Sequence, residues 1–230
     1  MRALLLPIKD LRHAKQRLAG FLSPEERFQL AQAMLADTLR AVRNVRKAGK
    51  VFVVTNYAPA MRVAEESGWG LLPEERQISE SASVDTASRE CERRGITAVL
   101  RIPLDVPLVQ ARDIDDLLAV VCAAPAVVIV PSRDGTGTNA ILRTPPTLFP
   151  SHFGNGSFAK HCDEAQRAGA QVVVRRNARL EMDVDEEADL RELAQHDLSG
   201  TETGAWVRQN GILARLQRQS PFGVRAGASV

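Results

Sequence analysis

The sequence predicts an α/β protein with one mostly parallel β-sheet that carries helices on both faces. Short apolar runs rich in β-branched residues recur along the 230 residues, and amphipathic helical patterns lie between them. This alternation makes neighbouring strands parallel, because a parallel connection needs a helix-length crossover. The composition, 44% hydrophobic and 25% charged, is ordinary for a globular chain that buries a full core.

The first strand and the first helix have clear boundaries. Ala3–Leu6 is an apolar run that ends at Pro7. The helix begins after Ser23, which suits an N-cap because proline follows at the first helical position and glutamate at the third. Apolar residues at spacings of three and four continue this helix to about Lys47.

The remaining elements follow the same two periodicities. We expect strands at Val51–Thr55, Ala98–Ile102, Ala126–Pro131 and Val172–Val174, and helices near 59–67, 84–94, 111–123, 157–168 and from about Gly200 to Leu216. No internal repeat or linker is present, so residues 1–219 are expected to form one domain. Residues 220–230 are small and polar, and we expect a disordered tail there.

Composition and charge exclude several classes of function. The three cysteines form no CxxC pair, which argues against a disulfide framework and a zinc site and favours a cytoplasmic protein. No apolar run is long enough for a membrane span or a signal peptide. The net charge of +2 gives no case for nucleic acid. Residues 1–50 hold eleven basic against four acidic residues and the rest is acidic overall, which fits one site for a polyanion and a cation.

Acidic residues follow two predicted strands, at the edge where open parallel sheets bind ligands. Asp105 lies between two prolines, where its carboxylate suits Mg²⁺; an Asx turn or a helix cap is the alternative. Asp183 and Asp185 flank Val184 in a strand-like stretch, which would place both carboxylates on one face within reach of a hard cation. A polar edge strand that leads into a helix is the alternative for this pair.

Two glycine-containing segments are candidates for binding an anion. Gly135–Asn139 offers unobstructed backbone N–H groups and two hydroxyls, which is typical of a phosphate or carboxylate cradle or of a plain loop. Ser157 follows Gly154-Asn155-Gly156 and precedes a helical pattern, so we expect an N-cap at a helix terminus that also suits an anion. His161 lies one turn further along, and we expect it on the surface of this helix rather than facing the site.

A basic segment follows the first strand. Lys9, Lys15 and Arg17 would supply mobile cations for a triphosphate, although the chain has no GxxxxGK[ST] P-loop and no GxGxxG motif. The four histidines show no metal-binding spacing, and no GxSxG elbow is present, which argues against a hydrolase triad.

A wider pattern combines these segments. It consists of Pro7-Ile8-Lys9, Ala14-Lys15-Gln16-Arg17-Leu18, Arg27, Leu30, Ala31, Met34, Leu35, Asp37, Pro131-Ser132-Arg133-Asp134-Gly135-Thr136-Gly137-Thr138-Asn139, Phe153-Gly154, Ser157-Phe158 and Asp183-Val184-Asp185. From about Ala3 to about Leu190 the chain thereby resembles the phospholactate or phosphoenolpyruvate guanylyltransferases of deazaflavin coenzyme biosynthesis. The Gly/Thr segment with the later Phe-Gly and Ser-Phe pairs is the most specific part.

The resemblance implies a nucleotide-diphospho-sugar-transferase-like variant of the Rossmann fold, with GTP as the nucleotide and Mg²⁺ as the metal. The catalytic groups that it implies are Asp105, Asp183 and Lys15, and the metal ligands are Asp105, Asp183 and Asp185. The nucleotide would be bound by Pro7, Lys9, Lys15, Arg17, Ser83 and Asp85. The phosphorylated acid would be bound by Thr138, Gly154 and Ser157.

Two departures from the family pattern concern the nucleotide and the metal. Ser83-Val84-Asp85 stands where the family usually has Gly-Leu-Asn beside the nucleotide, which bears on guanine specificity. Leu104-Asp105-Val106-Pro107 stands in place of Ala-Asp-Leu-Pro and keeps the carboxylate.

The reaction implied is transfer of GMP from GTP to 2-phospholactate, phosphoenolpyruvate or 3-phosphoglycerate, with release of pyrophosphate. Two alternatives are a molybdopterin or sugar-phosphate nucleotidyltransferase and a catalytically idle nucleotide-binding module. The 153–158 segment argues against the first, and the retained carboxylates argue against the second. The expected partners are GTP and the small phosphorylated acid, without nucleic acid or membrane, and a homodimer is one expected assembly.

Overall fold

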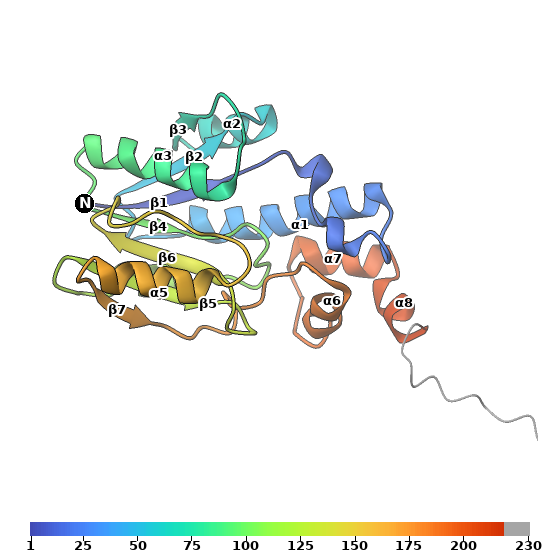
Figure 1. Cartoon of the computed structure of the whole chain (residues 1–230). Helices are drawn as coiled ribbons and strands as arrows, with labels where there is room; N and C mark the ends of the chain where they lie inside the picture. Colours follow the sequence, from blue (N-terminus) through green and yellow to red (C-terminus); the bar gives the residue numbers. More distant parts are fainter. Residues whose placement is uncertain (219–230) are drawn as a thin grey trace, which may run out of the picture.

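The computed structural model describes residues 1–218 and contains a seven-stranded sheet with helices on both faces (Figure 1). The strands are β1 (Arg2–Pro7), β2 (Lys50–Thr55), β3 (Gly70–Pro73), β4 (Ala98–Arg101), β5 (Ala126–Pro131), β6 (Thr138–Thr144) and β7 (Gln171–Val174). Their order in the sheet is β3-β2-β1-β4-β6-β5-β7. All neighbours are parallel except β6, which is antiparallel to β4 and β5. The predicted mostly parallel α/β fold is confirmed.

Residues 1–218 contain eight α-helices and two short 3₁₀ helices, of which α6, α7 and α8 follow the last strand. They are η1 (Leu11–His13), η2 (Gln16–Leu18), α1 (Pro24–Arg43), α2 (Ala58–Glu66), α3 (Glu80–Arg93), α4 (Ala111–Ala119), α5 (Ser157–Arg167), α6 (Glu187–Leu193), α7 (Glu202–Gln209) and α8 (Ile212–Arg218). None of these helices is long and apolar enough to cross a membrane. The tail predicted at 220–230 lies outside the described residues.

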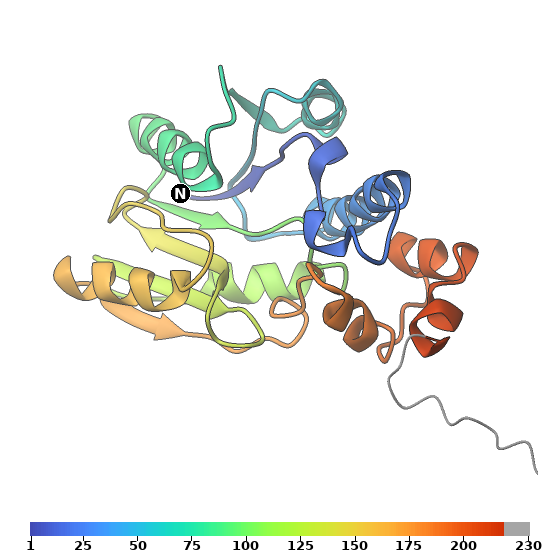
Figure 2. The same cartoon turned by 45° about the vertical axis from the view of Figure 1, so that its right-hand side comes forward.

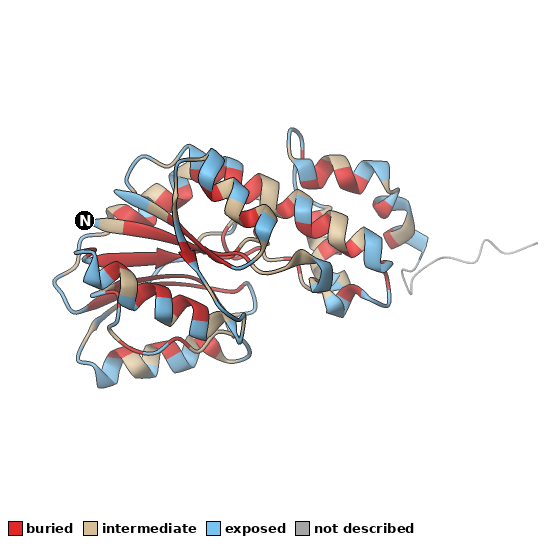
Figure 3. Cartoon of the chain, turned by 90° about the horizontal axis from the view of Figure 1, so that it is seen from above, coloured by how far each residue is buried: buried red, intermediate tan, exposed pale blue. Residues whose placement is uncertain are grey.

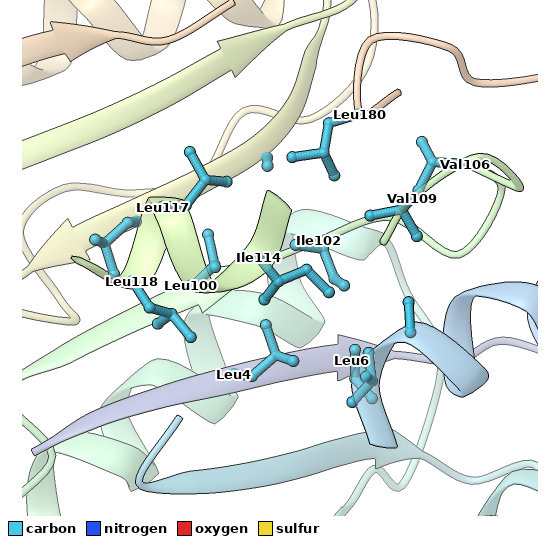
Figure 4. Close-up of a cluster of buried hydrophobic side chains, with 14 of the residues drawn as sticks. Leu4, Leu6, Leu100, Ile102, Val106, Val109, Ile114, Leu117, Leu118 and Leu180 are labelled. Atoms are coloured by element: carbon cyan, nitrogen blue, oxygen red, sulfur yellow. The ribbon is translucent and has the colours of Figure 1, made fainter. Parts of the chain in front are cut away.

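The two faces of the sheet bury alternate side chains of the same strands. In β1, Leu4 and Leu6 point to the face covered by α1, α2 and α4, whereas Ala3 and Leu5 point to the face covered by α3. Figure 4 shows Leu4 and Leu6 in the hydrophobic cluster on the α1, α2 and α4 face, with Ile114 of α4 nearby. Because β1 is buried on both faces (Figure 3), its sequence is apolar without alternation.

The C-terminal helices pack against α1 beside the sheet (Figure 2). Apolar side chains of α6, α7 and α8 form a second core with Leu30 and Met34 of α1. The buried Asp37 of α1 accepts hydrogen bonds from the backbone N–H groups of Glu202 and Thr203, both at 2.9 Å. A side chain of α1 therefore caps the first turn of α7 and connects the two helices.

Helix boundaries differ from expectation where a side chain redirects the backbone. The capping box at Ser23 is confirmed, but α1 ends at Arg43 rather than near Lys47. The carboxylate of Asp115 accepts from the backbone N–H groups beyond this end, at 3.0 Å for Arg46 and 2.8 Å for Lys47. The N–H groups of Arg46 and Lys47 thus bond to a side chain and not to carbonyl oxygens of α1.

Other differences come from caps and glycines. α3 begins at Glu80 rather than 84, because the Ser79 side chain accepts from the N–H of Ala82. α4 ends at Ala119 rather than 123. The helix expected from Gly200 to Leu216 is two helices, α7 and α8, and the chain between them has Gly211 at φ +60°.

The strands β3 and β6 and the 3₁₀ helices η1 and η2 were not predicted from the sequence, and a helix at α6 was expected only under the alternative interpretation of the 183–185 segment. β6 contains Asn139 and Arg143, which are buried and hydrogen-bonded. Polar residues inside the strand hide its apolar pattern. β3 spans only four residues at the edge of the sheet and begins at Gly70, so it carries little periodicity.

Gly204 in α7 lies close to the backbone of Leu198, and this close packing can be tested by substitution. A Cβ there would lie 2.3 Å from the carbonyl oxygen of Leu198. Overpacking costs about 1–3 kcal/mol, and the gain of about 1 kcal/mol for alanine in a helix offsets only part of that cost. We expect Gly204→Ala to lower the free energy of unfolding in urea. Gly20→Ala is the control, because a Cβ there meets nothing within 4 Å; an equal loss in both variants would contradict the prediction.

Candidate active site

Two adjoining cavities lie at the carboxyl ends of the parallel strands, where open α/β sheets bind ligands. The larger, about 810 Å³, is lined by residues after β4 and β5, the start of β6 and the segments 153–157 and 183–189. The smaller, about 200 Å³, is lined by residues after β1 and by part of α1. The residues that line both cavities are Glu80, Arg101, Pro103 and Asp105. The two spaces therefore share one wall.

The structure brings most of the predicted site residues to these cavities. The smaller cavity is lined by Pro7, Lys9, Lys15 and Asp105. The larger cavity is lined by Arg17, Asp105, Thr138, Gly154, Ser157, Asp183 and Asp185. Ser83 and Asp85 line neither of them.

Lys15 connects two of the predicted metal ligands. Its Nζ lies 2.6 Å from Oδ2 of Asp105 and 2.8 Å from Oδ1 of Asp185, and only 7% of its side chain is exposed. Burial alone would lower the pKa of Lys15, but the two carboxylates outweigh burial and raise it above the ordinary value. Burial likewise opposes ionisation of Asp105, but Lys15 keeps its pKa below the ordinary value. Lys15 and Asp105 are therefore both charged at neutral pH.

Asp183 forms no ion pair with a basic side chain among residues 1–218. Its carboxylate accepts from Nδ2 of Asn139 at 3.0 Å. Burial, followed by the charge of Asp105, raises the pKa of Asp183, and Asp185 adds to this effect. Burial and the two neighbouring carboxylates therefore both oppose the negative charge of Asp183.

The 183–185 segment is not a strand, which corrects the expected strand-like stretch. The N–H of Val184 donates to the carbonyl oxygen of Asp105 at 3.2 Å. Val184 is fully buried, so the side chains on either side of it face the cavity. Asp183 and Asp185 are therefore held at one site by the backbone hydrogen bond to Asp105 and by the buried side chain of Val184.

The three carboxylates suit a hard cation in chemistry, because oxygen ligands are what Mg²⁺ prefers. They line one cavity, and a positive charge there would offset the mutual repulsion of Asp105, Asp183 and Asp185. Among residues 1–218, however, no three metal-ligating side chains are close enough to form a ready-made metal site. Lys15 occupies the space between two of them.

The Gly135–Gly137 turn is not the open cradle of N–H groups that the sequence suggested. The N–H of Thr136 donates to Asp134 at 3.0 Å, and the N–H of Gly137 donates to Oγ of Ser132 at 2.7 Å. Hydrogen bonds from Ser132 and Thr136 lower the pKa of Asp134 to about 2. The loop's own side chains thus use the N–H groups that the cradle interpretation assigned to a ligand.

Ser157 is the first residue of α5 and not its N-cap, which is a second correction. The N-cap is Gly156, whose φ of +68° suits glycine, and the N–H of Ser157 donates to the carbonyl oxygen of Gly154 at 3.1 Å. Ser157 is buried and lines the larger cavity. Within the described residues its hydroxyl makes no hydrogen bond.

His161 is buried, not on the helix surface as expected. Its Nδ1 lies 2.9 Å from Oγ1 of Thr138, and its Nε2 lies 2.9 Å from the backbone nitrogen of His152. The prediction failed because the segment 149–153 covers this face of α5, and that long-range contact leaves no periodic signal in the sequence.

Arg101 and Glu80 are site residues that the sequence reasoning missed. The guanidinium of Arg101 pairs with Glu80, donates to the carbonyl oxygen of Asn139 at 2.8 Å and lies 4.3 Å from the ring centroid of Phe153. Only 6% of Arg101 is exposed. The sequence does single out Arg101, because it is the one charged residue in the apolar run Ala98–Ile102.

Ser83 and Asp85 are used inside the fold. The Ser83 hydroxyl donates to the carbonyl oxygen of Ser79 at 2.9 Å. The Asp85 carboxylate accepts from both the backbone nitrogen and the hydroxyl of Ser151 and from Arg143. The expectation that they bind the nucleotide finds no support in this geometry. Their side chains face the α3 turn and the 143–151 segment.

Arg17 remains available to a ligand. Its side chain is 67% exposed and pairs with Glu186 at 3.3 Å, an exposed contact of little energy. It therefore suits the mobile cation that the sequence predicted.

Comparison with known proteins places this site in a family. The family model described as "Guanylyl transferase CofC like" matches residues 1–226. A phosphoenolpyruvate guanylyltransferase of Conexibacter woesei is 34% identical over 94% of this chain and 97% of that protein. A 2-phospho-L-lactate guanylyltransferase of Methanothermobacter thermautotrophicus is 31% identical over 94% of each chain.

A solved structure supports the fold. A protein of Desulfovibrio desulfuricans, provisionally assigned as a nucleotide-diphospho-sugar transferase, has a TM-score of 0.73 at 16% identity and covers 94% of this chain and 97% of its own. The predicted likeness to that fold is confirmed. With its sheet, its cavities and these matches taken together, the chain belongs to the family of CofC-like guanylyl transferases and is a nucleotidyltransferase.

Proposed function

We propose that this protein transfers GMP from GTP to a small phosphorylated acid and releases pyrophosphate, as a step in deazaflavin coenzyme biosynthesis. The observation that carries the proposal is one cavity whose lining includes three carboxylates and the Thr138 and Ser157 hydroxyls. Relatives that act on phosphoenolpyruvate and on 2-phospho-L-lactate support the acceptor class. Phosphoenolpyruvate, 2-phospholactate and 3-phosphoglycerate are the acceptors to test.

The proposed chemistry is a single in-line displacement. An oxygen of the acceptor phosphate forms a bond to the α-phosphorus of GTP, and the bond from that phosphorus to the oxygen bridging to the β-phosphate breaks. Pyrophosphate leaves with the bonding electron pair. The attacking phosphate is already an anion at neutral pH, so the site needs no strong base.

The protein must instead bring two polyanions together. Lys9 and Lys15 line the smaller cavity and Arg17 the larger, which suits them to the triphosphate. Mg²⁺, bound by Asp105, Asp183 and Asp185, would supply the charge that neutralises the reacting phosphates. Thr138, Gly154 and Ser157 would hold the acceptor.

The carboxylates provide the first test of this function. We expect Asp105→Asn and Asp183→Asn each to lower kcat by more than about 100-fold, because each removes charge from the centre that stabilises the transition state. Pyrophosphate release at saturating Mg²⁺ is the measurement. Asp116→Asn, at an exposed position of α4, is the matched control. Near wild-type kcat in either site variant would remove that residue from the proposed metal site.

Substrate choice provides the second test. A matrix of GTP, ATP, CTP and UTP against the three phosphorylated acids, read by pyrophosphate release, should give turnover with GTP and at least one acid. Equal rates with ATP or CTP would contradict the guanine assignment. Turnover with a sugar phosphate or a molybdopterin in place of the acids would favour another nucleotidyltransferase, and no turnover would favour an idle binding module.

The hydroxyl groups provide the third test. Thr138→Val and Ser157→Ala should each raise the acceptor KM by about 10-fold or more, because a hydrogen bond to a charged group contributes about 1.5–3 kcal/mol. The KM for GTP should change far less. Thermal melting of both variants controls for folding. If both variants weaken GTP and leave the acceptor KM unchanged, the two subsites are assigned the wrong way round.

A further inference from the structure

His161 is a buried histidine to which the proposed reaction gives no role. None of its surface is exposed, and it lies among the rings of Phe149, Phe153 and His152. Both ring nitrogens have a partner at 2.9 Å: Nδ1 meets Oγ1 of Thr138, and Nε2 meets the backbone nitrogen of His152. Every polar atom of the side chain is therefore engaged.

These partners determine the tautomer of His161. The backbone nitrogen of His152 is a donor only, so Nε2 must accept and carries no hydrogen. The ring hydrogen of the neutral imidazole is then on Nδ1, which donates to Oγ1 of Thr138.

The surroundings keep the ring neutral. Burial, followed by the positive charge of Arg143, lowers the pKa of His161 to about 3, and His152 and Arg101 add to the effect. The donor at Nδ1 is therefore present without a charge throughout the neutral pH range.

This contact constrains the hydroxyl of Thr138. A hydroxyl has one hydrogen and two acceptor lone pairs. Because Oγ1 accepts from His161, its own hydrogen must point elsewhere, and no acceptor for it exists among residues 1–218. Thr138 lines the larger cavity, so a bound acceptor molecule is the partner available to this hydrogen.

We propose that His161 is a positioning residue that directs the Thr138 hydroxyl hydrogen into the cavity and makes this subsite specific for an anionic acceptor group. The inference rests on the proposed function, in which Thr138 binds the phosphorylated acid. A fixed donor favours a carboxylate or phosphate oxygen. It disfavours a ligand that presents only a donor to Thr138, because the hydroxyl hydrogen of Thr138 would then be left unpaired.

Two substitutions separate positioning from support of the fold. In His161→Asn the amide nitrogen is as many bonds from Cβ as Nδ1, so the donor to Thr138 is kept and the contact to His152 is lost. In His161→Gln the side chain reaches the Nε2 position, so the contact to His152 is kept and the donor to Thr138 is lost. The two variants therefore remove opposite halves of the same bridge.

We expect His161→Gln to raise the acceptor KM by roughly 10-fold or more, with the KM for GTP unchanged, and His161→Asn to restore most of the loss. In a Thr138→Val background, His161→Gln should add little, because its effect acts through that hydroxyl. Equal losses in both single variants, or the full loss from His161→Gln in the Thr138→Val background, would overturn the proposal.

The wild-type protein gives a readout that does not depend on any variant folding. Nitrogen-15 NMR of the histidine rings should show His161 as the Nδ1–H tautomer without titration through the neutral pH range. An Nε2–H tautomer or a titrating ring would overturn the inference. If Thr138→Val itself leaves the acceptor KM unchanged, the acceptor site of the proposed function fails. If Thr138→Val raises it but His161→Gln does not, only the positioning role fails.

Discussion

The ammonium group of Lys15 is the contact on which the arrangement of the site depends. It joins Asp105, which follows β4, to Asp185, which precedes α6, so three segments far apart in the sequence meet at one buried atom. Lys15 has a φ of 55°, a left-handed conformation that costs a non-glycine residue on the order of 1–2 kcal/mol. The two ion pairs offset this cost. Without a cation there, Asp105, Asp183 and Asp185 would crowd like charges into one partly buried wall.

The lining of the larger cavity contains two chemically different sets of groups: the three carboxylates, called the acidic side, and the Thr138 and Ser157 hydroxyls, called the hydroxyl side. The acidic side depends on cations, whereas the hydroxyl side is neutral. Arg101 lies against the cavity, but Glu80 and a backbone carbonyl already engage its guanidinium. An anionic ligand is therefore attracted by cations on the acidic side and by the exposed Arg17. The hydroxyls of Thr138 and Ser157 orient the ligand through hydrogen bonds and add no charge.

Periodic and capping signals predicted the fold and the segments of the site, and side-chain contacts that leave no such signal decided the rest. The capping box at Ser23 and the apolar run of β1 depend on near neighbours, and both are confirmed. The Gly135–Gly137 N–H groups were misjudged because Ser132 and Asp134 bond to them, which composition does not show. The burial of His161 depends on a segment about ten residues away folding over α5. The roles of individual side chains in the reaction stay predictions.

The proposed reaction adds a geometric condition that links the two sides of the cavity. The acceptor phosphate is the nucleophile, so it must reach the α-phosphorus near the carboxylates. The acid group of the same molecule then remains for the hydroxyl side. The two sides are close together, because Asn139, next to Thr138 in β6, donates to Asp183 at 3.0 Å. A small molecule with anions at both ends can therefore meet cations at one end and directed donors at the other. An acceptor with a single anionic group would leave the hydroxyl side unpaired, which is a physical reason for this site to prefer a phosphorylated acid over a simple phosphate ester.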